Sequence, residues 1–282
     1  MMRLLHGRPL AERIETRSRE RSAALQARNV SPRLAVVSVG ADAAANTYLG
    51  RLVSRGRRVA VAVDDVALPR DASERDLAAA LDRLARDRAV HGVLLLTPLP
   101  ASLEAARIVD RIAVDKDVEG MNPFNAGLLA EGRPSFVPST AEAAIELLKF
   151  YEVRLSGARV TVVGRSTVVG RPLAALLVAE DATVTIAHSK TPDLAATTRN
   201  ADIVVVGAGR ARLVRGDMVR HGAIVIDAGI NVTPQGIVGD VDAESMAAVA
   251  AALSPVPGGL GSVTTELLLR NVLTAAEKLT AD

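Results

Sequence analysis

Short apolar runs alternate along the chain with longer segments in which apolar residues recur every three or four positions. The runs at 34–39 and 92–96 are mostly aliphatic, and their length is typical of buried strands. The segments 9–28 and 43–57 have the apolar period of amphipathic helices. Strands that alternate with helices predict parallel sheets with right-handed crossovers, and therefore an α/β fold.

The first half of the chain predicts a three-stranded unit. A capping box at Ser73-Glu74-Arg75-Asp76 opens a helix whose leucines share one face. Residues 115–138 are rich in glycine and proline, show no apolar period, and are expected to form a long loop. Loops of this length are often functional. The strands expected here are 34–39, 59–63 and 92–96, the last of which ends at Thr97-Pro98-Leu99-Pro100.

The second half predicts a further α/β unit behind a linking helix. This helix, at 139–151, is expected to be capped by Ser139, with Glu142 at its third position. Glycine-containing segments, 207–209 and 229–231, follow two of the strands at the positions where ligands bind in open α/β sheets. The strands expected in this unit are 160–163, 183–187, 202–206 and 223–227.

These patterns predict two α/β domains. A glycine- and proline-rich loop at 254–262 precedes a last helix at 263–278, which is expected to pack back on the first domain. The expected domains are residues 1–138, joined by the C-terminal helix at 263–282, and residues 139–262. A chain of 282 residues is long enough to give each of them a core.

Composition narrows the class of protein. The hydrophobic fraction of 49% is that of a globular chain, and no apolar run reaches the roughly 18 residues of a membrane span. The first residues lack the features of a secretory signal peptide, so we expect a cytoplasmic protein with no membrane partner. Charges of both signs alternate around a net charge of +2, which argues against nucleic-acid binding. There is no cysteine, and the histidines have no metal-ligand spacing, so no metal is expected.

The segment RVTVVGRSTVVGRP, residues 159–172, carries the first chemical signal. A β-branched run leads into Gly164-Arg165-Ser166, and Gly170 precedes an apolar helical run. Strand, glycine turn and helix together place bare backbone N–H groups where a phosphate can sit. The sequence therefore predicts a dinucleotide-binding, Rossmann-like domain.

The next predicted strand indicates which dinucleotide is bound. It ends in His188-Ser189-Lys190 and carries no acidic residue. An acidic residue at that position holds the ribose 2′-hydroxyl of NAD, whereas cationic and hydroxyl groups suit the 2′-phosphate of NADP. We therefore expect NADP.

Several motifs in order resemble one family, the methylenetetrahydrofolate dehydrogenase/cyclohydrolases of the FolD type. Most specific are GRSTVVGRP at 164–172, AHSKT at 187–191, GAIVIDAGIN at 222–231 and PVPGG at 255–259. Further matches are Val39-Gly40 before Tyr48, TPLP at 97–100, KDVEG at 116–120, NPFN at 122–125 with Gly127, and VGDVD at 238–242.

The resemblance implies a cleft between two α/β domains, with the tetrahydrofolate substrate against the first and NADP on the second. It implies cofactor contacts from Gly164, Arg165, Ser166, Gly170, Ser189 and Ile230, with Arg165 and Ser189 as partners of the 2′-phosphate. It implies a folate wall from Pro257, Gly258 and Gly259, catalytic roles for Tyr48 and Glu119, and a homodimer.

The sequence departs from the family pattern in the chemistry of the first domain. The family tyrosine is kept as Tyr48, but leucine stands at the lysine position, 52, and at the glutamine position, 96. Glu119 replaces an aspartate. Smaller departures are Ala43-Ala44-Ala45, Thr97 and Ser262. The only lysines are at 116, 149, 190 and 278, and Lys116 alone could approach from another loop.

These departures affect the two reactions differently. Hydride transfer from the methylene carbon needs alignment but no side chain that accepts a proton. Hydrolysis of the methenyl product needs a positioned water and proton transfer, to which leucine cannot contribute. We therefore expect dehydrogenase activity with weak or absent cyclohydrolase activity. The alternatives are a fully bifunctional enzyme, a degenerate paralogue that binds folate or nucleotide, and an enzyme acting on another one-carbon carrier.

Several of these residues also have a purely structural interpretation. Tyr48 could be an ordinary buried aromatic residue, Glu119 a solvated carboxylate, and the glycines simple turn residues. Asp227 is expected to be a strand-end carboxylate that fixes the Gly229 loop rather than a catalytic acid.

Overall fold

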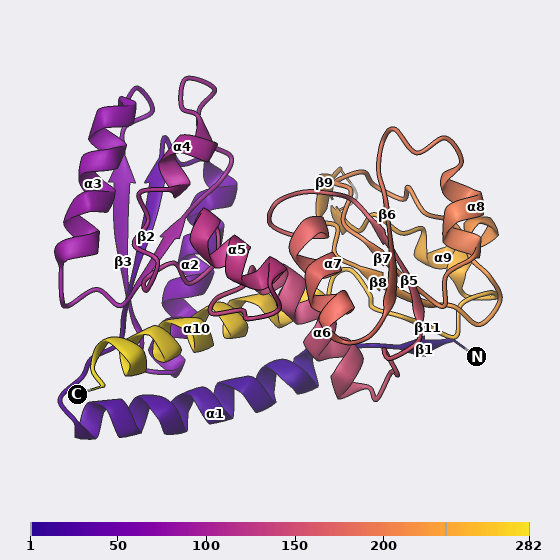
Figure 1. Cartoon of the computed structure of the whole chain (residues 1–282), viewed down its shortest axis with the longest axis horizontal. Coiled ribbons are helices and arrows are strands. Elements are labelled where there is room, and N and C mark those ends of the chain that lie inside the picture. Colours follow the sequence, from indigo (N-terminus) through magenta and orange to yellow (C-terminus); the bar gives the residue numbers. More distant parts are fainter. Residues whose placement is uncertain (1, 235, 282) are drawn as a thin grey trace. The chain divides into compact units, whose positions relative to one another are not determined.

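The computed structural model describes residues 2–234 and 236–281, and it divides into two compact units (Figure 1). The N-terminal unit contains Arg13–Leu128, Pro134–Val137 and the residues from Thr265 on. The C-terminal unit contains the residues up to Glu12, Leu129–Arg133 and Pro138–Thr264. Both are α/β, as the sequence predicts. The boundaries between the expected folate and cofactor domains, after residues 138 and 262, stay a prediction. Residues 1 and 282 lie outside the described part of the chain.

The N-terminal unit contains a parallel three-stranded sheet in the order β3-β2-β4. The central strand β2 is almost entirely buried, which explains its mostly apolar sequence. The strands are β2 (Arg33–Val39), β3 (Ala62–Leu68) and β4 (Gly92–Leu95). The helices that begin in this half of the chain are α1 (Arg8–Ala27), α2 (Ala43–Arg58), α3 (Glu74–Arg86), α4 (Ala105–Val109) and α5 (Pro123–Ala130). The predicted capping box of α3 is present, with Ser73 and Asp76 bonded reciprocally.

The predicted strand at 59–63 is wrong. The amide groups of Val59 and Val61 both donate to the carbonyl oxygen of Gly56, and Ala60 has a φ of 52°. The segment is therefore the turn that ends α2, and its valines are apolar because they fill the core. The strand begins at Ala62 and includes Asp64 and Asp65, whose charges hid it from the apolar pattern.

Two expectations for residues 115–142 are also corrected. The expected loop contains the helix α5, which has only 8 residues and is too uniformly apolar to show a period. Helix α6 (Ser139–Phe150) begins one residue earlier than a Ser139 cap requires, so Pro138 occupies the cap position. No side-chain hydrogen bond caps this helix.

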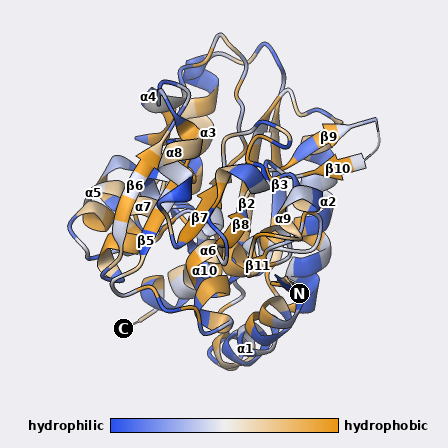
Figure 2. Ribbon diagram, turned by 90° about the vertical axis from the view of Figure 1, so that its right-hand side faces the viewer, coloured by the Kyte–Doolittle hydropathy of each residue, from blue (hydrophilic) through white to orange (hydrophobic). Residues whose placement is uncertain are grey.

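The C-terminal unit is built on a parallel six-stranded sheet in the order β1-β11-β8-β7-β5-β6. Figure 2 shows its central strands β7 and β8 as hydrophobic, and nearly all of their residues are buried. The strands are β1 (Arg3–Leu4), β5 (Arg159–Val163), β6 (Thr183–Ala187), β7 (Ile203–Val206), β8 (Ile224–Asp227) and β11 (Ala252–Leu253). The four longer strands confirm the prediction. The two-residue strands β1 and β11 are too short to show a period.

Shorter elements complete this unit. Strands β9 (Asn231–Thr233) and β10 (Gly236–Val238) form a separate antiparallel ribbon. The helices are α6, α7 (Gly170–Ala179), α8 (Leu194–Arg199) and α9 (Ala243–Met246), with single 3₁₀ turns at Gly216–Met218 and Leu260–Ser262. No helix among residues 2–234 and 236–281 is long and apolar enough to cross a membrane.

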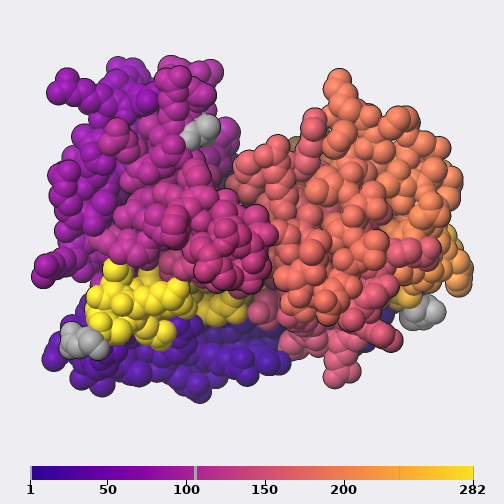
Figure 3. All heavy atoms as spheres, viewed as in Figure 1, coloured from indigo at the N-terminus to yellow at the C-terminus, as the bar shows by residue number. Residues whose placement is uncertain are grey.

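The last helix, α10 (Thr264–Leu279), supplies much of the N-terminal unit's core. Its yellow atoms lie against the indigo atoms of α1 in Figure 3, where Arg21 pairs with Glu277 at 2.6 Å. Its leucines and Val272 pack in the same buried cluster as β2. Because it is buried along most of its length, α10 is an integral part of this unit.

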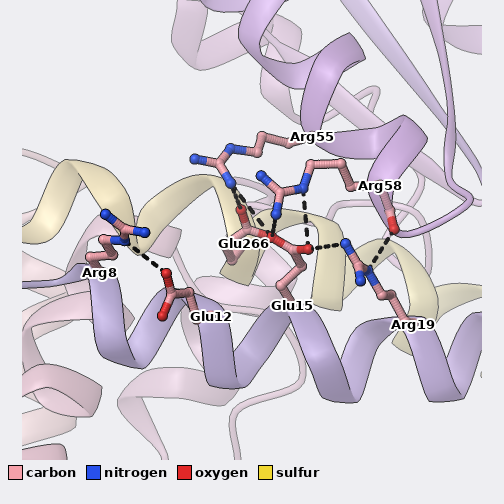
Figure 4. Close-up of polar contacts among 7 residues, drawn as sticks. All are labelled: Arg8, Glu12, Glu15, Arg19, Arg55, Arg58 and Glu266. Atoms are coloured by element: carbon pink, nitrogen blue, oxygen red, sulfur yellow. Dashed lines mark hydrogen bonds and ion pairs between the residues drawn. The ribbon is translucent and has the colours of Figure 1, made fainter.

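An ionic cluster of two buried glutamates and three partly exposed arginines ties α1, α2 and α10 together (Figure 4). Glu15 of α1 lies 2.5 Å from Arg19 and 2.9 Å from Arg58. Arg55 lies 3.5 Å from both Glu15 and Glu266. Burial raises the pKa of Glu266 to about 7, although Arg55 opposes this shift. The cluster thus holds a carboxyl group that titrates near neutral pH.

Candidate active site and cofactor site

Tyr48 and Glu119, the two predicted catalytic residues, lie close together in the N-terminal unit. Tyr48 projects from α2 and packs against the apolar cluster that contains Val36 and Val118. Burial raises the pKa of the Tyr48 hydroxyl; the nearby Glu119 carboxylate raises it further, and Arg51 lowers it. The hydroxyl therefore stays protonated at neutral pH and is available as a hydrogen-bond donor.

Positions 52 and 96, which depart from the family pattern, carry apolar residues and also have apolar neighbours. Leu52, one turn after Tyr48 on α2, is 0% exposed and belongs to this apolar cluster. Leu96, at the end of β4, packs against the same cluster. Neither side chain can donate, accept or titrate, so these two positions offer Tyr48 no hydrogen-bonding partner.

Lys116 does not replace the missing lysine. Its ammonium group donates to the carbonyl oxygens of Leu84, Ala85 and Asp87, at 2.9, 3.0 and 2.7 Å. These three bonds use all the protons of the ammonium group to satisfy the end of α3. The other lysines contact groups elsewhere: Lys149 contacts Glu180, Lys278 contacts Ser135 and the ring of Phe136, and Lys190 lies exposed in the turn after β6.

Asp117 organises the loop that carries Glu119. Its buried carboxylate accepts hydrogen bonds from the backbone amides of Met121 and Asn122 and from the side-chain amide of Asn125. Burial raises the pKa of Asp117, and these donors oppose the shift. No role for Asp117 was expected from the sequence, because its burial is evident only in the folded structure.

In the C-terminal unit, the remaining candidate residues follow adjacent parallel strands. Because all these strands are parallel, the loops after them share one edge of the sheet. In spatial order they follow β11, β8, β7, β5 and β6. These loops contain Pro257–Gly259, then Ile230, then Gly207, then Gly164–Ser166, then Ser189.

The turn after β5 requires glycine for steric reasons. Gly164 has a φ of 129°, and a Cβ atom there would overlap the carbonyl oxygen of Gly207. A Cβ atom at Gly170 would overlap the carbonyl oxygen of Gly164. Three glycines therefore bring the backbones of β5, α7 and β7 together. This leaves a bare backbone surface at the N-terminus of α7, which suits a pyrophosphate.

The side chains around this turn are polar or cationic. The hydroxyl oxygen of Ser166 accepts a hydrogen bond from the amide of Val169 at 3.1 Å, and Arg165 is exposed. After β6, the amide of His188 donates to Thr191 Oγ1, so the turn that carries exposed Ser189 is internally fixed. No carboxylate is present in this turn. This set fits a phosphate-bearing ribose.

The predicted folate wall is fixed by the chain's own N-terminal segment. The amide of Gly7 donates to the carbonyl oxygen of Gly258 at 2.8 Å. Gly258 has a φ of 105°, and a Cβ atom at Gly7 would overlap the carbonyl oxygen of Gly259. Ile230, in the loop after the neighbouring strand β8, is 65% exposed.

Two models of one family match almost the whole chain. Its catalytic domain, described as tetrahydrofolate dehydrogenase/cyclohydrolase, matches residues 5–119, and its NAD(P)-binding domain matches residues 138–280. The chain belongs to the tetrahydrofolate dehydrogenase/cyclohydrolase family. The family membership inferred from the sequence motifs is thereby confirmed. The chain is an enzyme of a family named for an oxidoreductase and a hydrolase activity, with a domain for a nicotinamide dinucleotide.

Relatives and solved structures of this family agree over nearly their full length. The chain is 50% identical over 275 residues to the bifunctional protein FolD of Nocardia farcinica, covering 97% of each chain. It is 52% identical to that of a Parafrankia species, covering 98% and 99%. The bifunctional FolD structure from Campylobacter jejuni superimposes with a TM-score of 0.96 at 37% identity, covering 99% of each chain.

A further structure of this family bears on the cofactor. The FolD enzyme of Trypanosoma brucei, described as complexed with NADP and an inhibitor, superimposes with a TM-score of 0.94 at 35% identity, covering 98% of each chain.

Within the described residues of the present structure, no group of three or more histidine, aspartate or glutamate side chains could hold a metal ion.

Proposed function

We propose that this chain is an NADP-dependent 5,10-methylenetetrahydrofolate dehydrogenase whose cyclohydrolase activity is weak or lost. One observation carries the second half of this proposal. Leu52 and Leu96 place an apolar surface beside Tyr48, where the family pattern has a lysine and a glutamine.

The order of loops along the C-terminal sheet supports the cofactor assignment. The loop with Ser189 lies at one end, the glycine turn with Gly164, Arg165, Ser166 and Gly170 lies next, and Ile230 lies further along. A dinucleotide laid across this edge would place its 2′-phosphate near Arg165 and Ser189 and its pyrophosphate on the glycine turn. Its nicotinamide would lie near Ile230, beside the folate wall of Pro257, Gly258 and Gly259. The relative solved with NADP supports the same cofactor.

The dehydrogenase step needs little from the side chains. When bound, NADP⁺ would supply the acceptor for a hydride from the methylene carbon of the folate. The Tyr48 hydroxyl remains protonated and can donate a hydrogen bond to the substrate. The Glu119 carboxylate adds negative charge near Tyr48, which would favour a cationic product. No residue here has to accept a proton.

The hydrolytic step makes a demand that this site does not meet. Attack by water on the methenyl carbon requires a positioned water molecule and removal of its proton. Leu52 and Leu96 can neither position water nor accept a proton, and Lys116 is held at the end of α3. General acid–base help of this kind is worth about 10²–10⁴-fold in rate.

A fully bifunctional enzyme is the second candidate. Its support is that the relatives at 50% and 52% identity are both called bifunctional. For this candidate, another group must supply the proton transfer, and Glu119 is the carboxylate whose charge acts on Tyr48.

Paired assays on one purified sample separate the two candidates. Reduction of NADP⁺ with methylenetetrahydrofolate measures the first step, and hydrolysis of methenyltetrahydrofolate measures the second. We expect turnover in the first assay and a hydrolysis rate at least about 10²-fold below that of a relative with the lysine. Rapid hydrolysis would instead establish bifunctionality, and absence of NADP⁺ reduction would refute both candidates.

We also propose that the enzyme is a homodimer. The β9–β10 ribbon exposes large apolar side chains: Val232 is 84% exposed and Ile237 is 46% exposed. A two-stranded ribbon is marginal in isolation, and its free edge can pair with an identical edge of a second copy. Light scattering on the enzyme and on a Val232→Lys, Ile237→Lys variant tests this. We expect a dimer for the first and a monomer for the second.

A further inference from the structure

Asp240 is a fully buried carboxylate at the cofactor edge of the C-terminal sheet. It is 0% exposed, and its Oδ2 atom accepts hydrogen bonds from the backbone amides of Ala208 and Gly209 at 2.6 and 2.7 Å. Its Oδ1 atom accepts a hydrogen bond from the side-chain amide of Asn231 at 2.8 Å. One carboxylate thus holds the loop that follows β7 and the residue after Ile230.

A second buried carboxylate holds the first in place. Asp227 accepts hydrogen bonds from the amides of Gly229, Asp240 and Val241, at 2.9, 3.0 and 2.9 Å. Its own amide donates to Ser254 Oγ, in the loop after β11. The expected role of Asp227, fixing the Gly229 loop, is therefore confirmed, and it extends to the backbone of Asp240.

The local glycines show that the chain closes tightly over both carboxylates. A Cβ atom at Gly229 would overlap the side chain of Asp240, and one at Gly239 would overlap the side chain of Asp227. A buried carboxylate is costly unless donors surround it, and here six amide groups point at the two side chains. This arrangement supplies both buried carboxyl groups with hydrogen-bond donors from the chain itself.

We propose that Asp240 is a positioning residue for the dinucleotide, with Asp227 setting the position of Asp240 itself. This inference rests on the proposed cofactor site. Asp240 holds the Gly207–Gly209 loop against Gly164 and fixes Asn231 beside Ile230, so the loops after β7 and β8 keep their geometry before the cofactor arrives. Preorganisation of this kind lowers the entropic cost of binding.

The steric contact between two loops makes this position sensitive. The carbonyl group of Gly207 faces Gly164 so closely that a Cβ atom at Gly164 would overlap it. Any movement of the loop after β7 therefore changes the shape of the glycine turn at Gly164, where the pyrophosphate is proposed to bind. Asp240 is hydrogen-bonded to Ala208 and Gly209, so it acts on the glycine turn through the loop after β7.

The test compares Asp240→Asn with the matched control Asp242→Asn. Asparagine at 240 must place its NH₂ group against either the two backbone amides or the side chain of Asn231, so at least one bond is lost. Asp242, two residues further on, makes no side-chain capping hydrogen bond. At a temperature where all proteins are folded, we expect the Kd for NADP⁺ to rise about tenfold or more for the first variant and to change less than about twofold for the second.

The expected kinetic signature is a raised KM for NADP⁺ with kcat at saturating NADP⁺ changed by less than about threefold. If Asp240→Asn lowers the Tm but leaves the Kd of the folded protein unchanged, the residue is merely structural and the proposal is overturned. If the unaltered enzyme itself fails to bind NADP⁺, the proposed cofactor site is wrong instead.

Hydrogen exchange on the unaltered enzyme keeps the proposal testable if the variant does not fold. The amides of Ala208 and Gly209 should be protected without NADP⁺, because both are already bonded to Asp240. Exchange at the rate of an open loop, with protection only after NADP⁺ is added, would overturn the proposal.

Discussion

The ammonium group of Lys116 lies 2.7 Å from the carbonyl oxygen of Asp87, immediately after the last turn of α3. Together with its bonds to Leu84 and Ala85, this contact fixes the role of the lysine nearest to Glu119 in the chain. The side chain stabilises a helix end, and its pKa is lowered because it is buried.

Replacing Lys116 with methionine should therefore affect stability more than chemistry. Three carbonyl oxygens lose their donor, and we expect a loss of roughly 2–4 kcal/mol in the free energy of unfolding. The kcat of the folded dehydrogenase should change less than about threefold. Denaturant unfolding and steady-state kinetics measure the two effects. A collapse of kcat in fully folded protein would indicate a catalytic lysine.

Restoring the family residues at 52 and 96 should restore hydrolysis. A Leu52→Lys, Leu96→Gln variant would place an amine and an amide beside Tyr48, and we expect methenyltetrahydrofolate hydrolysis to rise at least about 10²-fold. The Tm should fall, because a charged group replaces a fully buried leucine. Leu52→Met, which conserves volume without adding a base, is the control. A variant that hydrolyses no faster than the parent enzyme would contradict the proposed cause.

Arg165 should determine the preference for NADP over NAD. An Arg165→Ala variant loses the cation proposed to face the 2′-phosphate, so its KM for NADP⁺ should rise about tenfold. Its KM for NAD⁺ should stay nearly constant, because NAD⁺ lacks that phosphate. Arg154→Ala serves as the control, because Arg154 is an exposed arginine in the segment before β5, at the opposite end of that strand from the glycine turn. Equal effects on both cofactors would remove Arg165 from the 2′-phosphate site.

Gly164→Ala should impair cofactor binding. The added methyl group would overlap the carbonyl oxygen of Gly207, and the φ of 129° is strained for alanine. We expect the Kd for NADP⁺ to rise by more than about tenfold. Gly127→Ala is the control, because nothing lies within 4 Å of the added atom. Isothermal titration calorimetry on both variants decides the matter, and an unchanged Kd for Gly164→Ala would be inconsistent with a cofactor at this turn.

Glu266 should make stability fall as the pH rises. Burial raises its pKa from 4.5 to about 7, so the folded protein holds this proton more tightly than the unfolded chain does. The full benefit is present below about pH 4.5 and is lost as the pH rises through 7. The loss is up to roughly 3 kcal/mol, and Glu266→Gln should abolish it. Thermal unfolding from pH 5 to 8 measures this. In the control, Glu277→Gln, the pH dependence should match that of the parent enzyme.

The sequence predicted β2, β5, β7 and β8 because each is a mostly buried aliphatic run close to a glycine, and it predicted the largely exposed β6 from its β-branched residues. It misplaced β3 because Val59 and Val61 are apolar for a tertiary reason: they fill the core from a helix-ending turn. Strands β1 and β11 form only because each pairs with a neighbour far away in sequence, which no local pattern records.

The residues of the site that belong to recognisable sequence motifs could be predicted. Gly164 and Gly170 were found because their steric role repeats a known local geometry. The role of Asp117 was not found, because its nearby donors Met121, Asn122 and Asn125 converge on it only when this segment folds. The role of Asp240 was not found, because its donors come from other loops. The same applies to Lys116, whose role depends on the distant end of α3.

The parallel order of the C-terminal strands also has a consequence for how such an enzyme can change. Each ligand-facing segment leaves from its own strand, so a replacement at Ser189 leaves the backbone pairing of β8 and β11 untouched. The residues that determine cofactor preference and those that recognise folate can therefore change independently, in evolution or by protein engineering.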